Sequence, residues 1–245
     1  MISIYQKLTV AGAVLSFAAI GTNAVQASQL VYSNDFEGTV GSEWSKTSTE
    51  MTPKGGRNFL GRFASEAVSL KLDNLTPHTD VSVSFDLFII QSWDGNNTIY
   101  GSDIWELSVA NGTTLLSTTF TNNPAFTQSY PNAFSSGDNP ARSGADENNT
   151  LGYINYYGDS VYNLSFIFPH VDDSLELIFS GSKLNFAGLT QDSERWGLDN
   201  VKLSVTPAIS IGSTKIVPIP EPDTILGLAT CGVVGLLIRK KAGIS

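Results

Sequence analysis

The sequence predicts an all-β domain, an antiparallel β-sandwich of the jelly-roll kind, over residues 28–206 of the 245-residue chain. Apolar residues recur there with a period of two, which is the side-chain period of a strand. No segment of this region has the pattern of an amphipathic helix of ordinary length. The intervening segments are rich in Gly, Asn, Asp, Ser and Pro, the residues that form turns. Many strands joined by such turns favour two sheets packed face to face.

The longest predicted strand runs from Val81 to Ile90, where large apolar residues alternate with Ser and Asp. Its second face turns apolar near the end, at Phe88 and Ile90, so this part of the strand is expected to be covered on both sides. Eight further segments show a strand pattern: 29–36, 59–63, 67–72, 104–109, 114–120, 161–168, 175–179 and 198–205. The dipeptide Asn111-Gly112 predicts a tight hairpin turn between two of them, because both residues tolerate positive φ.

The first 27 residues have the three parts of a secretory signal peptide. Lys7 supplies a positive charge, and residues 8–20 are apolar except for Thr9 and Ser16. The small residues of Val25-Gln26-Ala27 then predict cleavage by signal peptidase after Ala27. The alternative is an N-terminal membrane anchor, which the shortness of the apolar run and the cleavage site disfavour. The mature chain is therefore expected to begin at Ser28.

The other end of the chain combines three features within 28 residues. Pro220-Glu221-Pro222 is followed by an uncharged apolar helix over 224–238 and then by the basic cluster Arg239-Lys240-Lys241. This order resembles the PEP-CTERM sorting signal of exported bacterial proteins, here residues 218–245, preceded by a linker over 207–217. The resemblance implies a transient or permanent membrane anchor, recognised and cut near Pro-Glu-Pro by an exosortase in the membrane. The alternative is a buried C-terminal helix of the main domain, although no face of this helix is polar.

Charge and cysteine usage agree with export of the central region. Between residues 28 and 220, ten Lys or Arg stand against 21 Asp or Glu, a formal net charge of −11. Such a surface argues against binding to nucleic acid or to anionic lipid head groups. The one cysteine, Cys231, lies in the predicted C-terminal helix, so no disulfide is expected in the domain. We therefore expect an acidic protein at the cell surface or outside the cell, stabilised by its core.

Two acidic segments lie at opposite ends of the predicted domain. Asp35-Phe36-Glu37 ends the first strand, and Asp199-Asn200 lies within the last. Both segments resemble those of jelly-roll, lectin-like carbohydrate-binding modules and related adhesion domains. The resemblance implies adjacent terminal strands and a structural calcium held by Glu37 and Asp199, with Asp35 and Asn200 as further ligands. The alternative is that Asp35 and Glu37 cap a turn while Asn200 faces solvent.

A sugar site is predicted from aromatic and acidic residues in the loops. Trp93 and Asp94 follow the longest strand, where the indole could stack on a pyranose ring and the carboxylate could bind hydroxyls. Residues 121–158 form a long loop region of a kind that is usually functional or disordered. Tyr153, Tyr156 and Tyr157 in its later part are candidates for an exposed aromatic patch. The alternative for Trp93 and Asp94 is an ordinary hairpin tip.

No catalytic constellation is visible. Asp86 and Glu106 are each unpaired along their strands, and His78 and His170 suggest neither a triad nor a metal site. The sequence therefore favours a non-catalytic protein of the cell surface or the exopolysaccharide matrix, delivered by its C-terminal signal. The first alternative is a carbohydrate-binding module that recognises extracellular polysaccharide, and the second is a glycan hydrolase or lyase with dispersed carboxylates.

Overall fold

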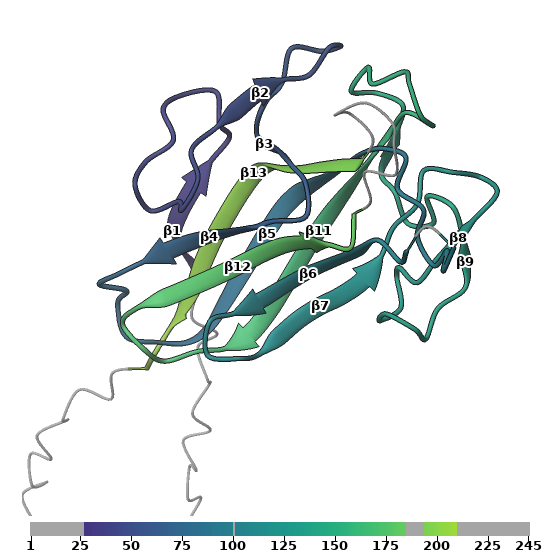
Figure 1. Ribbon diagram of the computed structural model, residues 1–245. Coiled ribbons are helices and arrows are strands. Elements are labelled where there is room, and N and C mark those ends of the chain that lie inside the picture. The colour runs from purple at the N-terminus through teal and green to yellow at the C-terminus, as the bar shows by residue number, and fades with distance from the viewer. Residues whose placement is uncertain (1–26, 100, 185–193, 210–245) are drawn as a thin grey trace, which may run out of the picture. The chain divides into compact units, whose positions relative to one another are not determined.

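The computed structural model describes residues 27–99, 101–184 and 194–209, and all regular structure in this part of the chain is β (Figure 1). The predicted signal peptide, the sorting signal at 218–245 with its helix, and the linker beyond Ile209 lie outside these residues. Within the described ranges, no helix is long and apolar enough to cross a membrane. The fold is thus all-β, as the sequence predicts.

The larger sheet is built around two long strands, β5 (His78–Gln91) and β13 (Glu194–Pro207), which pair with each other along their length. Its order is β10 (Glu147–Asn148), β11 (Asp159–Pro169), β5, β13, β3 (Asn58–Phe63) and β2 (Thr49–Met51). The remaining strand, β1 (Gln29–Asn34), pairs with the later half of β13. All of these pairings are antiparallel.

The smaller sheet has the order β4 (Ala67–Leu72), β12 (Leu175–Ser182), β6 (Ile104–Val109) and β7 (Thr114–Thr119), again antiparallel. The predicted Asn111-Gly112 hairpin is confirmed between β6 and β7, with Gly112 at φ 98°. A separate short pair, β8 (Thr127–Gln128) and β9 (Asn139–Pro140), lies in the long loop region.

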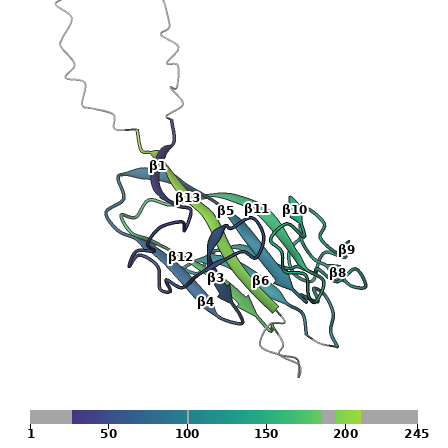
Figure 2. The ribbon, with the colours of Figure 1, turned by 90° about the horizontal axis from the view of Figure 1, so that it is seen from above.

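Aromatic side chains from both sheets meet in the space between them. Phe85 of β5 contacts Phe179 of β12 edge to face, with ring centroids 5.3 Å apart. Trp105 of β6 contacts Trp196 of β13 in the same way at 6.1 Å. Such pairs add to the stabilisation by burial alone. These contacts join the two layers seen in Figures 1 and 2 into one antiparallel sandwich.

The last part of β5 is covered on both faces, as its sequence predicts. Phe88 and Ile90 point away from the main core and are fully buried in a second cluster with Phe59 of β3. Leu151 and Tyr153 from the loop region and Val161 of β11 complete that cluster. The loop region is therefore packed onto the larger sheet by its own apolar residues.

One end of the sandwich carries the longest connections. Gln91 of β5 lies opposite Glu194 of β13, and Ile90 lies opposite Asp159 of β11, so these strand ends coincide. The segments that leave them are residues 92–99, 101–103 and 120–158, which we call the loop end. Figure 1 shows them gathered around β8 and β9, away from the start of β1.

Candidate functional site

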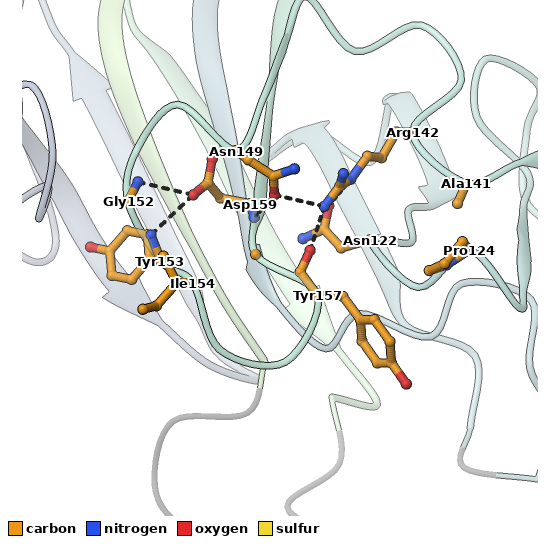
Figure 3. A pocket seen from close by; sticks show the side chains of 11 residues that line it. Asn122, Pro124, Ala141, Arg142, Asn149, Gly152, Tyr153, Ile154, Tyr157 and Asp159 are labelled. Atoms are coloured by element: carbon orange, nitrogen blue, oxygen red, sulfur yellow. Dashed lines mark hydrogen bonds between the residues drawn. The ribbon is translucent and has the colours of Figure 1, made fainter.

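A cleft of about 620 Å³ opens in the loop end. Three loop stretches, within residues 122–124, 141–142 and 149–158, and the first residue of β11 line it (Figure 3). The lining residues are Asn122, Pro124, Ala141, Arg142, Asn149, Gly152, Tyr153, Ile154, Tyr157, Gly158 and Asp159. Its size lies within the range of small-molecule sites.

Asp159 fixes one wall of the cleft. Its carboxylate is fully buried and accepts hydrogen bonds from three consecutive backbone amides, those of Leu151, Gly152 and Tyr153, each at 3.1 Å. Hydrogen bonds from several amides to one carboxylate are stronger than bonds between neutral groups. Both carboxylate oxygens accept such bonds, and Figure 3 shows the two from Gly152 and Tyr153 to one oxygen. Asp159 therefore positions the loop.

Arg142 is held at the opposite side. It donates from Nη2 to Asn149 Oδ1 at 3.0 Å and to the backbone carbonyl of Tyr157, and from Nε to Asn122 Oδ1 at 3.4 Å. Asn122 is buried and donates to two carbonyls of β5, which makes it a rigid support. Among the described residues, Nη1 of Arg142 makes no hydrogen bond. The guanidinium therefore retains donors for a ligand.

The three predicted tyrosines occupy different positions. Tyr157 lines the cleft with half of its surface exposed, whereas Tyr156 is 36% exposed but does not line it. Tyr153 lines the cleft but is buried, and its hydroxyl donates to Glu50 at 2.9 Å. Burial, and then Glu50, raise the pKa of Tyr153 well above its usual range. Of the three tyrosines, only Tyr157 both lines the cleft and is exposed.

Tyr156 and Tyr157 are consecutive residues at φ 49° and 72°. The left-handed region is unfavourable for bulky residues, and such conformations cluster at ligand sites. The hydrogen bond from Arg142 to the Tyr157 carbonyl helps to hold this turn. This turn places the Tyr157 carbonyl at the guanidinium, and the Tyr157 ring points away from it (Figure 3).

Trp93 does not belong to this site. Its side chain is fully buried, and its Nε1 donates to the Arg195 carbonyl at 2.8 Å. The prediction that Trp93 stacks on a sugar is therefore corrected: the turn after β5 directs the indole into the core. Asp94 lies apart from the cleft lining, in a separate acidic cluster with Asp103 and Glu194.

The two predicted calcium ligands are each engaged by groups of the protein. Glu37 is exposed, and its oxygens accept from Asn58 N at 2.9 Å and Asn58 Nδ2 at 2.6 Å. Asp199 is buried and accepts from the backbone of Asn200 at 2.8 Å and from Arg57 Nε at 3.3 Å. The cation beside Asp199 is thus a guanidinium. Calcium at Glu37 and Asp199 stays a prediction.

Arg57 is a residue that sequence reasoning missed. It pairs with Asp86 at 3.0 Å, with Glu147 at 3.2 Å and with Asp199 at 3.3 Å, and it lies over the Phe88 ring. Burial is the main cause that raises the pKa of Asp199 to about 6, while the Asn200 hydrogen bond and the Arg57 charge act against it. Asp86 faces Asp199 across the β5 and β13 pairing, so neither acid is isolated.

No family model matches the chain, and no curated protein matches its sequence. Similar solved structures include carbohydrate-binding modules and an adhesin domain. The xylan-binding CBM22-1 domain of Paenibacillus barcinonensis Xyn10C shares 15% identity, with a TM-score of 0.35, over 76% of this chain and 100% of that one. A CBM6 module of Cellvibrio mixtus lichenase 5A, solved with cellotriose, shares 12% identity at a TM-score of 0.35, over 73% and 99%.

The K3 adhesin domain of Lys-gingipain from Porphyromonas gingivalis also shares 12% identity at a TM-score of 0.35, over 71% of this chain and 98% of that one. Identities and TM-scores this low establish no common function. The function must therefore be argued from the cleft itself.

Proposed function

We propose that this chain is a non-catalytic carbohydrate-binding protein and that the loop-end cleft holds the sugar. The observation that carries the proposal is that one cleft is lined by the half-exposed Tyr157, the fixed guanidinium of Arg142 and the exposed amide of Asn149. An aromatic ring can cover the apolar face of a pyranose, and a few polar groups then fix the orientation of its hydroxyls. Recognition of a sugar uses both the aromatic contact and the polar contacts.

The same cleft favours binding over hydrolysis. Glycoside hydrolases generally use two carboxylates that flank the scissile bond. Asp159 is the one carboxylate among the described residues that line the cleft, and its two oxygens already accept three backbone hydrogen bonds. Asp86 is one of the two strand carboxylates that were considered for catalysis. It pairs with Arg57 and accepts a hydrogen bond from Asn200 Nδ2 at 2.8 Å.

A glycan array probed with the full chain, carrying neutral and acidic polysaccharides, tests the proposal. Calorimetry on each hit should then show that Tyr157→Ala weakens binding at least about tenfold, because one well-stacked aromatic contact accounts for about 1.4 kcal/mol or more. Tyr156→Ala is the matched control: it removes a neighbouring exposed ring outside the cleft lining and should bind normally. Failure to bind any polysaccharide would sink the proposal, as would equal affinities of Tyr157→Ala and the unaltered chain.

Export is the second part of the proposal. It is supported by the sequence patterns of residues 1–27 and 218–245, which imply signal peptidase and an exosortase as processing partners and a membrane anchor at 224–238. A chain that ends at Pro220 should then be released into the medium, whereas the full chain stays with the cells. Retention of the shortened chain at the cell would contradict this and would assign attachment to the sandwich domain.

A further inference from the structure

A second cluster of polar groups at the loop end is separate from the sugar cleft. Asp94 follows β5, Asp103 precedes β6 and Glu194 begins β13, so three segments distant in sequence contribute one carboxylate each. One oxygen from each carboxylate lies within 4.8 Å of the others. Asp103 is 1% exposed and Glu194 is 4% exposed, while Asp94 is partly exposed.

The two oxygens of Asp103 have different surroundings. Oδ2 accepts a hydrogen bond from the backbone amide of Asp94, and the Asp103 amide donates to the Gly95 carbonyl at 3.1 Å. These bonds fix the carboxylate on its loop. Within residues 27–99, 101–184 and 194–209, no group donates a hydrogen bond to the buried Oδ1, a costly situation for a carboxylate oxygen. A bound cation would satisfy this oxygen.

A further acceptor lies next to the cluster. Gln91 ends β5 directly opposite Glu194 of β13. Its amide Oε1 is also buried, and no described residue donates a hydrogen bond to it. Side chains of directly opposed residues project from the same face of a sheet. The amide oxygen can thus add a neutral ligand to three carboxylates.

We propose that Asp94, Asp103 and Glu194 form a calcium site that ties the loop after β5 to the start of β13. Calcium binds oxygen ligands at about 2.3 to 2.6 Å, so two ligands of one ion can be at most about 5 Å apart. The observed limit of 4.8 Å satisfies this condition for every pair. A set made only of carboxylate and amide oxygens suits a hard cation and does not suit zinc.

Calcium fits better than magnesium because the ligands are buried carboxylates rather than positions open to several waters. The competing state is a protonated Asp103. Burial first, and then the charge of Glu194, raises the pKa of Asp103 to about 9 in the absence of a cation. Calcium must displace that proton in order to bind, so a high proton affinity of Asp103 reduces the stability gained from calcium.

The test uses the full chain, stripped with a chelator and then returned to about 1 mM calcium, a concentration suited to extracellular calcium modules. Calcium should raise the melting temperature by several degrees, and magnesium should raise it less. Terbium provides a second readout, because Trp93 next to Asp94 should sensitise the luminescence of a bound ion. Asp103→Asn and Asp94→Asn should each weaken calcium binding at least about tenfold. Asp94 is partly exposed, so its substitution leaves a folded domain to measure.

Glu37→Gln and Asp199→Asn are the matched controls, since they remove the carboxylates of the site predicted from sequence. Both should retain the calcium response. No response of the unaltered chain would overturn the proposal, and so would a response that survives in Asp94→Asn and Asp103→Asn but disappears in Glu37→Gln. Tyr157→Ala should respond to calcium normally, which separates this outcome from that of the sugar-binding test.

Discussion

His78 and His170 form a buried pair in which Nε2 of the first lies 2.8 Å from Nδ1 of the second. Their rings are stacked, with centroids 5.1 Å apart. Nδ1 of His78 is 2.6 Å from the Thr76 carbonyl, which can only accept, so this nitrogen carries the hydrogen. Nε2 of His78 is then the acceptor for the Nδ1–H of His170. The pair joins the start of β5 to the end of β11.

This pair predicts a loss of stability in mild acid. Burial, and then the charge of His78, lower the pKa of His170 below 6.5. A base whose pKa is lowered by folding contributes stability that is complete above its unfolded pKa and is lost as the pH falls through the folded value. The two histidines are the only ones in the chain. The melting temperature should therefore drop between pH 7 and pH 5, and less steeply in His170→Gln. Parallel curves for the two proteins would contradict the assignment.

The effect of Asp199 on stability should have the opposite pH dependence to that of His170. Its pKa is raised to about 6, chiefly by burial, so its stabilising contribution is present below the unfolded pKa and is lost as the pH rises through 6. Asp199→Asn keeps the shape of the side chain and removes this titration. Urea unfolding at pH 5 and pH 7 should show that the variant gains relative to the unaltered chain at the higher pH. The prediction fails if the free energy difference between the two proteins is the same at both pH values.

We predict that the ion pairs of Arg57 stabilise the larger sheet. Arg57→Leu leaves Asp86, Glu147 and Asp199 without their common cation and should lower the free energy of unfolding by about 2 to 3 kcal/mol. Lys46→Ala is the comparison, because Lys46 pairs with Glu66 at the surface and should contribute less than about 1 kcal/mol. Urea unfolding at one pH measures both, and equal losses would argue against a special role for Arg57.

Trp93→Phe separates a structural role of this residue from a role in binding. The change removes the hydrogen bond to the Arg195 carbonyl and part of a fully buried ring, so we expect a loss of about 1 to 2 kcal/mol in the free energy of unfolding. Affinity for sugar should not change, because Trp93 does not line the cleft. Reduced affinity in a variant that remains folded would restore Trp93 as a ligand contact.

The sequence was informative wherever a pattern is local. All nine predicted strands are present, because alternation over five or more residues records which face is buried. The short strands β2, β8, β9 and β10 were missed, since two or three residues carry no period. Tyr157 could be named as a candidate from the sequence because aromatics stand out in a polar loop, and its role in binding stays a prediction. Tyr157 is exposed and Tyr153 is buried in a loop that Asp159 holds by hydrogen bonds. The sequence alone does not show these hydrogen bonds.

Other parts of the sites depend on contacts distant in sequence. Arg57 reaches Asp199 across 142 positions, and Asp103 meets Glu194 only because β6 and β13 begin at the same end of the sandwich. No motif joins such residues. The sequence also does not show that the Trp93 side chain is buried. The turn after β5, rather than the residue type, decides whether the indole faces solvent or the core.

The pairing of Gln29 with Val205 places the first and last described strands side by side, as Figures 1 and 2 show. Asp159, in the cleft, lies opposite Ile90, near the far end of the 14-residue strand β5. That strand is roughly 43 Å long at 3.3 Å per residue. Both flanking segments thus leave from one pole of the domain while the cleft occupies the other. A polymer bound in the cleft would therefore not contact the residues at which the described domain begins and ends.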